Sequence, residues 1–187
     1  MALGLNDVDV DGMKELDRKV RENPALGKRT VKLRSTWRRG AKALVEIGAQ
    51  DVMGKPATPP TRRFFITVDA PPGLGGVDAA ATAAEALVAS FAGCLTSGIA
   101  ANAALFDVPI DGLSVEMEAD IDFRGLLGHD KSVRNGFTDI RYTVTIESPA
   151  PEEKVRRCKE TIDRKSPVGD TLANPVKISS SFVHKRS

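Results

Sequence analysis

The sequence contains one residue on which thiol chemistry could be centred. This residue is Cys94, in the run Phe91-Ala-Gly-Cys94-Leu-Thr-Ser-Gly98. A cysteine thiolate is a nucleophile that a peroxide can oxidise to a sulfenic acid. A lone cysteine inside a helix, however, is more often a small apolar side chain of the core. The expected helix start at Thr82 lies about three turns away, and a helix dipole fades within its first turn, so a reactive thiolate needs a cation from another segment.

No other pattern in the sequence points to a catalytic or metal centre. The two histidines stand alone, and there is no HxxH, CxxC or phosphate-binding loop, so we expect no metal and no cofactor. The 27 basic and 25 acidic residues nearly balance, which gives no electrostatic basis for binding nucleic acid or an anionic membrane. Two cysteines without a secretory signal favour free thiols in a reducing, cytoplasmic setting.

The hydrophobic pattern before Cys94 predicts one amphipathic helix and three strands. Apolar residues recur at helical spacing near the N-terminus and then alternate with polar residues. We expect Arg38-Arg39-Gly40 to form the turn of a hairpin. The predicted elements are a helix at residues 7–22, a hairpin at residues 30–48 and a strand at residues 63–68.

The helix that carries Cys94 is expected to begin at a capping box formed by Thr82 and Glu85 and to end near Phe106. Small residues lie on nearly all of its sides, which is typical of a central helix that other elements approach closely. Its apolar stretch is only weakly hydrophobic, which favours a buried helix over a membrane span. One chain of this length with thin sheets would leave such a helix partly uncovered, so we expect a dimer.

Beyond this helix the pattern predicts two strands, a helix and a final strand. Cys158 falls on the apolar stripe of the second helix and is interpreted as a core residue. Antiparallel strands with helices on one face make an α+β domain, here residues 29–187, with residues 1–28 as an N-terminal helical extension. The predicted elements are strands at residues 115–123 and 140–146, a helix that opens at Pro151 and ends at Pro167, and a strand at residues 176–182.

Five segments resemble motifs of one known family. They are Gly75-Gly76, Thr82-Ala-Ala-Glu85-Ala-Leu, Ala-Gly93-Cys94-Leu, Asp122-Phe-Arg-Gly125 and Ser166-Pro-Val-Gly-Asp-Thr-Leu172. Together they resemble the OsmC/Ohr family of osmotically inducible and organic hydroperoxide resistance proteins, over roughly residues 30–184. The resemblance implies an antiparallel sheet packed on a long central helix and an intertwined homodimer with two active sites at its interface. It also implies thiol-dependent reduction of organic hydroperoxides.

The resemblance assigns roles to four residues. Cys94 corresponds to the peroxidatic cysteine, Arg38 or Arg39 to the arginine that activates it, and Glu85 to the glutamate that holds this arginine. Each assignment stands beside a structural interpretation, which is a solvated turn for the arginines and a capping-box partner for Glu85. Glu85 lies one residue closer to Cys94 than in hydroperoxide resistance members, which turns it to a different side of the helix.

Ser166 is a departure from the family pattern. The second, resolving cysteine of the family usually lies in a Cys-Pro-Val motif, which here reads Ser166-Pro167-Val168. Serine cannot form the disulfide, and Cys158 lies roughly 12 Å upstream along the same helix, beyond the ~7 Å that a disulfide spans between Cα atoms. Two functions therefore remain open. One is a one-cysteine peroxidase recycled by an external thiol, and the other is a non-catalytic protein that binds a small apolar ligand or a partner at the dimer interface.

Overall fold

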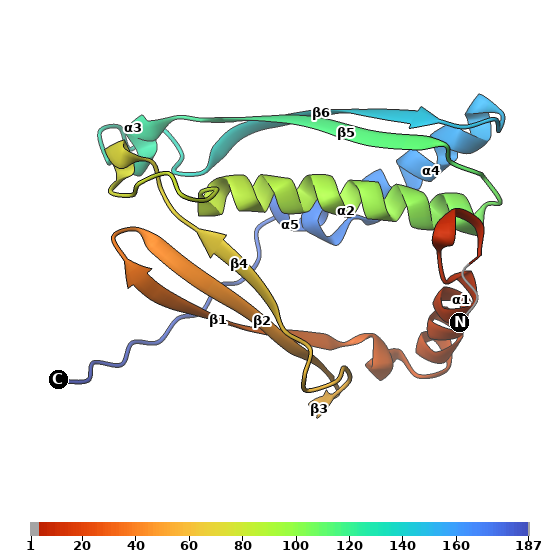
Figure 1. Ribbon diagram of the computed structural model, residues 1–187, viewed down its shortest axis with the longest axis horizontal. Coiled ribbons are helices and arrows are strands. Elements are labelled where there is room, and N and C mark those ends of the chain that lie inside the picture. The colour runs from red at the N-terminus through yellow and green to blue at the C-terminus, as the bar shows by residue number, and fades with distance from the viewer. Residues whose placement is uncertain (1–3, 187) are drawn as a thin grey trace.

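The computed structural model of the protein describes residues 4–186 and places one long helix, α2 (Ala83–Leu105), between two antiparallel sheets (Figure 1). Sheet A precedes α2 in the chain, and its strand β2 pairs with the other three strands. Its strands are β1 (Arg29–Arg39), β2 (Lys42–Val52), β3 (Lys55–Pro56) and β4 (Phe64–Val68). This mixed α+β arrangement with antiparallel strands and a long helix is the predicted fold class.

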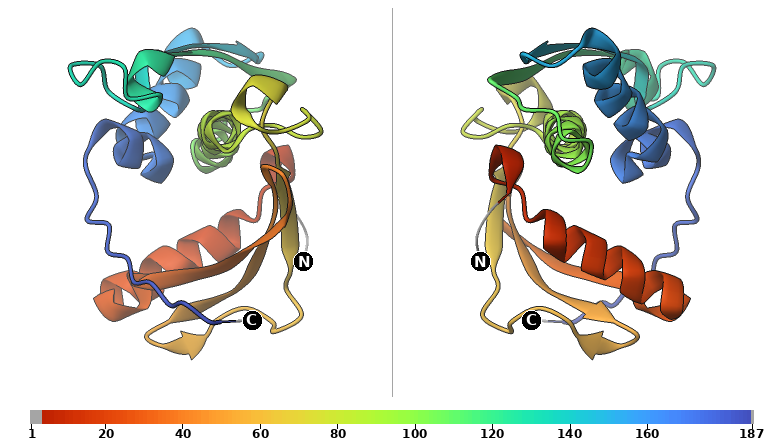
Figure 2. Two further views of the ribbon diagram at one scale, coloured as in Figure 1. Left: turned by 90° about the vertical axis from the view of Figure 1, so that its left-hand side faces the viewer. Right: turned by 90° about the vertical axis from the view of Figure 1, so that its right-hand side faces the viewer.

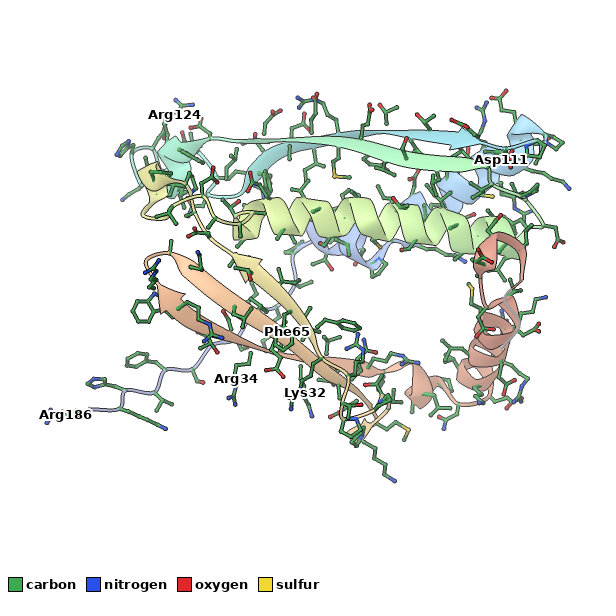
Figure 3. All side chains as sticks on the ribbon, viewed as in Figure 1. Lys32, Arg34, Phe65, Asp111, Arg124 and Arg186 are labelled. Atoms are coloured by element: carbon green, nitrogen blue, oxygen red, sulfur yellow. The ribbon has the colours of Figure 1, made fainter. Side chains whose placement is uncertain are left out.

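Sheet B follows α2 and consists of two strands, β5 (Gly112–Ile121) and β6 (Phe137–Glu147). Apolar side chains of both strands pack against the core, whereas charged side chains project from the opposite face (Figure 3). Glu118 and Arg141, both exposed, form an ion pair. This one-sided burial is what strict apolar–polar alternation dictates in an antiparallel sheet.

Two consecutive helices complete the layer beside α2, as both views of Figure 2 show. They are α4 (Glu152–Lys165) and α5 (Pro167–Ala173). Gly98 brings α2 and α4 close together, because a Cβ at this position would lie only 2.2 Å from Cδ1 of Ile162. The fully buried side chains at this contact include Leu95 and Ile99 of α2 and Cys158 of α4. Burying one such leucine or isoleucine contributes about 1.5–3 kcal/mol, so this contact anchors α2 in the fold.

The start of α2 is fixed by local hydrogen bonds. Thr82 and Glu85 form the predicted capping box, in which each side chain accepts a hydrogen bond from the backbone N–H of the other residue. Asp69, which is buried, accepts hydrogen bonds from the backbone N–H groups of Val77 and Ala79. These two clusters hold the connection from β4 into α2.

The N-terminal extension is attached to the far end of α2. Its helix α1 (Val10–Glu22) begins at the cap Asp9. The side-chain amide of Asn6 donates to the carbonyl oxygen of Val108 at 2.9 Å and accepts from the backbone N–H of Ile110 at 3.0 Å. Asn6 has a φ of 57°, a left-handed conformation that asparagine tolerates better than most residues. One side chain thus clamps the extension to the loop after α2.

The structure corrects three expectations. Arg38 and Arg39 are the last residues of β1, and the turn lies at Gly40 and Ala41, because the hairpin pairing extends to Arg39 and Lys42. Phe123 lies in the short helix α3 (Phe123–Leu126) and not in the preceding strand, because Asp122 caps this helix. The strand predicted at residues 176–182 is wrong for the single chain. Residues 174–186 form no regular structure there, since they pair with no strand (Figure 1).

α2 is the one helix within residues 4–186 that is long and apolar enough, by length and composition, to cross a membrane. Central helices of soluble proteins pass the same test, so the finding carries little weight.

Candidate active site

Cys94 lies in the middle of α2, half-buried, on the side of the helix that meets the junction between α4 and α5. Its Sγ is 3.2 Å from the Oγ of Ser166, which is within hydrogen-bond distance, and either group can donate. Ser166 is only 3% exposed. The structure thus brings together Cys94 and Ser166, two of the residues singled out in the sequence.

Ser166 reaches Cys94 because α4 ends there. Pro167 cannot continue a helix that needs its N–H, so the chain turns at Ser166 and starts again as α5. The Oγ of Ser166 accepts a hydrogen bond from the backbone N–H of Gly169 at 2.9 Å and so caps the new helix. A Cβ at Gly169 would lie 3.0 Å from the ring of Phe91, so glycine allows this close packing.

A groove opens beside this contact. Its volume is about 470 Å³, and it lies between α2, β6, α5 and the segment before β6. Phe91 forms part of the wall and meets the ring of Tyr142 edge-on, with the ring centroids 5.6 Å apart. The other apolar side chains of the lining are Leu87, Phe137, Ile140, Leu172 and Ala173. Cys94 and Ser166 do not line the groove, but Gly169 of its lining donates its backbone N–H to Ser166, and Phe91 of its lining lies one helical turn before Cys94.

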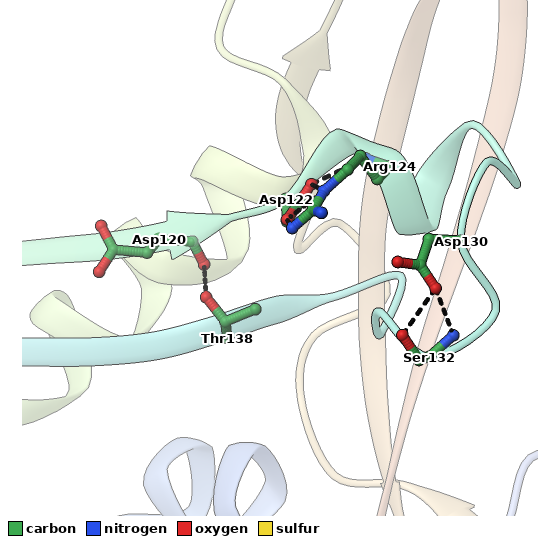
Figure 4. Close-up of polar contacts among 6 residues, drawn as sticks. All are labelled: Asp120, Asp122, Arg124, Asp130, Ser132 and Thr138. Carbon is green, nitrogen blue, oxygen red and sulfur yellow. Dashed lines mark hydrogen bonds and ion pairs between the residues drawn. The ribbon is translucent and has the colours of Figure 1, made fainter.

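Arg134 and Asp139 contribute charged groups to the lining of this groove. The position of Arg134 depends on the connection between β5 and β6, shown in Figure 4. Asp122 caps α3 and pairs with Arg124, and Asp130 accepts two hydrogen bonds from Ser132. Gly125 packs against backbone, because a Cβ there would lie 2.4 Å from the carbonyl oxygen of Arg134. The Asp122-Phe-Arg-Gly125 motif therefore shapes the segment that carries Arg134.

Arg38 and Arg39 do not contact Cys94 within one chain. They end β1 at the hairpin tip, and the backbone there approaches the loop before α2, where a Cβ at Gly40 would lie 3.6 Å from the carbonyl oxygen of Gly75. Within the described residues no cation lies within hydrogen-bond distance of the Cys94 sulfur. Cys94 is also about 18 Å along the helix axis from the cap at Thr82, at 1.5 Å per residue.

Glu85 is occupied by its capping box. The backbone N–H of Thr82 donates to its carboxylate at 2.7 Å and holds the pKa of Glu85 below its ordinary value. Among residues 4–186 no ion pair joins Glu85 to either arginine. The capping interpretation of this residue is confirmed.

Cys158 is a core residue in the structure. It is 1% exposed, and its thiol donates a hydrogen bond to the carbonyl oxygen of Lys154 at 3.2 Å. Burial raises the pKa of the Cys158 thiol, which favours the unreactive protonated form. Both cysteines are free, so Cys94 is the accessible thiol of the chain.

Sequence reasoning did not identify Phe91, Tyr142 or Arg134 as parts of this site. For Phe91 a signal was present, because it lies three residues before Cys94 and therefore on the same helix face. Tyr142 was expected in a strand. Its contact with Phe91 could not be predicted, because it depends on how β6 packs against α2. The approach of Arg134 depends on close backbone packing at Gly125, which no periodicity reveals.

Comparison with known proteins places this geometry in context. The family model described as OsmC-like protein matches residues 75–181. An OsmC-like protein from Mycoplasma pneumoniae is similar in structure, with a TM-score of 0.57, 14% identity and coverage of 78% of this chain and 89% of that chain. An OsmC-like protein of unknown function from Vibrio cholerae gives a TM-score of 0.52, 12% identity and coverage of 76% and 92%. No curated protein sequence matches the chain.

Proposed function

Because the chain belongs to the OsmC-like protein family, we propose that it is a one-cysteine thiol peroxidase in which Cys94 reduces organic hydroperoxides. The observation that carries this proposal is the placement of an accessible thiol beside an apolar groove, with a buried hydroxyl against its sulfur. The other cysteine, Cys158, is buried in the core and takes no part in the reaction.

The reaction runs in three steps. The Cys94 thiolate attacks the terminal oxygen of the hydroperoxide, the O–O bond breaks, and the leaving alkoxide takes up a proton to give an alcohol and a Cys94 sulfenic acid. An external thiol then attacks the sulfenic sulfur, which forms a mixed disulfide and releases water. A second external thiol restores Cys94 and leaves as the oxidised disulfide. No second protein cysteine is required.

The groove beside Phe91 supplies the site for the organic part of the substrate. Its apolar lining removes such a group from water, and each buried CH₂ contributes about 0.8 kcal/mol to binding. Arg134 and Asp139 are the charged groups that line this site. Leu87, which is exposed on α2, is the wall residue whose replacement by a charged side chain would block it.

One equivalent of cumene hydroperoxide followed by peptide mass spectrometry tests the function. We expect oxidation of Cys94, trapped as a sulfenic acid adduct, with Cys158 unmodified because it is buried. Cys94→Ser abolishes peroxide consumption and Cys158→Ser leaves it unchanged. A Cys94 that stays a thiol while a free-thiol control oxidises overturns the proposal.

A second candidate function is binding without catalysis. The absence of any cation within hydrogen-bond distance of Cys94 in the described chain, together with Ser166 at the resolving position, favours it. In this case anilinonaphthalene sulfonate binds wild type and Cys94→Ser equally, Leu87→Arg lowers the affinity, and no hydroperoxide is consumed. Peroxide consumption that is lost in Cys94→Ser would favour the peroxidase over this binding function.

We also propose that the functional unit is a homodimer. Sheet A exposes apolar side chains that a single chain does not cover, and Val176 and Ile178 in the C-terminal segment are exposed as well. Large apolar side chains exposed in such number on one sheet are typical of a surface that another protein covers. The exposed residues of sheet A are Val31, Leu33, Trp37, Phe64, Phe65 and Ile66. A second copy of this chain, with the same exposed sheet and an incompletely covered α2, is the complementary occupant.

In this dimer the activating cation comes from the second copy. Arg38 and Arg39 lie at an exposed hairpin tip and make no contact with Cys94 of their own chain. Arg34 of the same strand points away from α2 (Figure 3) and serves as the control position. Mixed dimers of Cys94→Ser with an Arg38→Ala/Arg39→Ala chain recover activity that neither homodimer has. Dimers with Arg34→Ala chains keep full activity. Failure of the mixture to recover activity overturns this assignment.

A further inference from the structure

The structure assigns Ser166 a positioning role: its hydroxyl donates a hydrogen bond to the Cys94 sulfur and favours the thiolate. This inference rests on the proposed function of Cys94. It concerns what serine does at a position where it cannot form a disulfide.

The partners of Ser166 leave its hydroxyl proton free for Cys94, and ionisation of Cys94 sets the direction of the hydrogen bond, because either group can donate while the thiol keeps its proton. A hydroxyl has one proton and two acceptor lone pairs. The backbone N–H of Gly169 already donates to the oxygen, at 2.9 Å, so the oxygen acts as an acceptor there. The hydroxyl proton then needs an acceptor of its own, and the Cys94 sulfur at 3.2 Å is the one that the described structure provides. A thiolate has no proton and can only accept, so the two groups are complementary when Cys94 is ionised.

The hydroxyl is held in place before the reaction begins. Ser166 is 3% exposed and is fixed at both sides, by the end of α4 and by the start of α5. The Gly169 N–H contact restricts rotation of the oxygen, and Phe91 packs against Gly169. A donor that is already oriented stabilises a charge without the cost of reorganising when the charge forms.

This arrangement explains how Cys94 can work without a cation from its own chain. A hydrogen bond to a charged group is strong enough to change an ionisation equilibrium tenfold or more. Ser166 forms no covalent bond in any step and transfers no electron. It shifts the equilibrium between the Cys94 thiol and its thiolate. The sulfenic acid formed later is reduced by the external thiol.

The test measures the rate of Cys94 alkylation by iodoacetamide as a function of pH, followed on the Cys94 peptide by mass spectrometry. Ser166→Ala should move the midpoint of this curve upward by about one pH unit and slow alkylation at pH 7 by about tenfold. Ser166→Gly should do the same while keeping most of the helix cap, because glycine is tolerated at that position. Ser166→Thr keeps the hydroxyl and should restore the wild-type midpoint.

Ser90→Ala is the matched control. Ser90 is an exposed serine of α2 whose hydroxyl donates to the backbone of Leu87, and its loss should leave the midpoint unchanged. Equal midpoints for wild type, Ser166→Ala and Ser166→Gly, with the folded state intact by circular dichroism, overturn the inference. The alkylation test uses no peroxide, so it can fail while the proposed function holds. The proposed function fails by a different result, which is that wild-type Cys94 is not oxidised by cumene hydroperoxide.

Discussion

Cys94 and Ser166 lie side chain against side chain, with Sγ and Oγ 3.2 Å apart, although they are 72 residues apart in the sequence. The contact joins the middle of α2 to the junction of α4 and α5. At the position where the family resemblance implies a second cysteine, a buried hydroxyl therefore meets the Cys94 sulfur. Under the proposed function, the oxidised form of Cys94 would have to be reduced by an external thiol, because serine forms no disulfide.

Restoring the second sulfur should convert the protein to a two-cysteine form. We expect Ser166→Cys to form a disulfide with Cys94 after one equivalent of cumene hydroperoxide, because the side chains already meet and need close only to the S–S length of about 2.05 Å. Intact mass spectrometry should show the loss of two hydrogen atoms, and peptide mapping should show the crosslink. Ser114→Cys, on the exposed side of β5, is the control and should give no crosslink. A Ser166→Cys protein that accumulates sulfenic acid without a crosslink would contradict the observed contact.

Gly98 should be sensitive to any added side chain. A Cβ there would lie 2.2 Å from Cδ1 and 2.4 Å from Cγ1 of Ile162, so α2 and α4 would have to separate. We expect Gly98→Ala to lower the free energy of unfolding by about 1–3 kcal/mol, measured by urea denaturation. Gly93→Ala is the matched control on the same helix, because apart from the neighbouring backbone of α2 no described atom would lie within 4 Å of a Cβ placed there. Equal losses for the two variants would argue against the close approach of the helices.

The sequence predicted the elements around the site better than the contacts within it. The capping box of Thr82 and Glu85 was predictable because both partners lie within one helical turn. The meeting of Cys94 with Ser166 could be anticipated only from a family motif, since it depends on how α4 and α5 pack against α2. The arginines show the limit, because alternation locates Arg38 and Arg39 in a hairpin but does not say what the two side chains contact.

The C-terminal segment shows a second physical limit. Val176, Ile178 and Phe182 have the spacing of a strand, yet a strand needs a partner edge, and this segment pairs with no strand of its own chain. A segment with strand propensity thus forms a strand only when another backbone supplies the hydrogen bonds of the sheet. The unpaired outer edge of β1 in a second copy is the kind of edge that this segment would fit.

The ionisation of Tyr142 should report the packing beside the groove. Burial, together with the hydrogen bond that its hydroxyl donates to Asp163 at 2.9 Å, raises the pKa of Tyr142 to about 12. Because the unfolded value lies near 10, this group stabilises the fold fully below pH 10, and its contribution is lost as pH rises toward 12. Tyr142 is the only tyrosine in the sequence, so absorbance at alkaline pH follows this group alone. Asp163→Asn should lower the midpoint, and a wild-type midpoint near 10 would contradict the packing.

Trp37 should report the proposed dimer directly. It is the only tryptophan in the sequence and is 71% exposed in the single chain, where its indole N–H donates to the carbonyl oxygen of Gly40. Burial of sheet A against a second copy would move it out of water, so we expect emission at short wavelength at micromolar concentration. Dilution should shift the emission to long wavelength as light scattering falls to the monomer mass. Leu33→Arg, on the same exposed strand, should give the monomer signal without dilution. A stable monomer at micromolar concentration, with water-exposed emission throughout, would show that sheet A is not the interface.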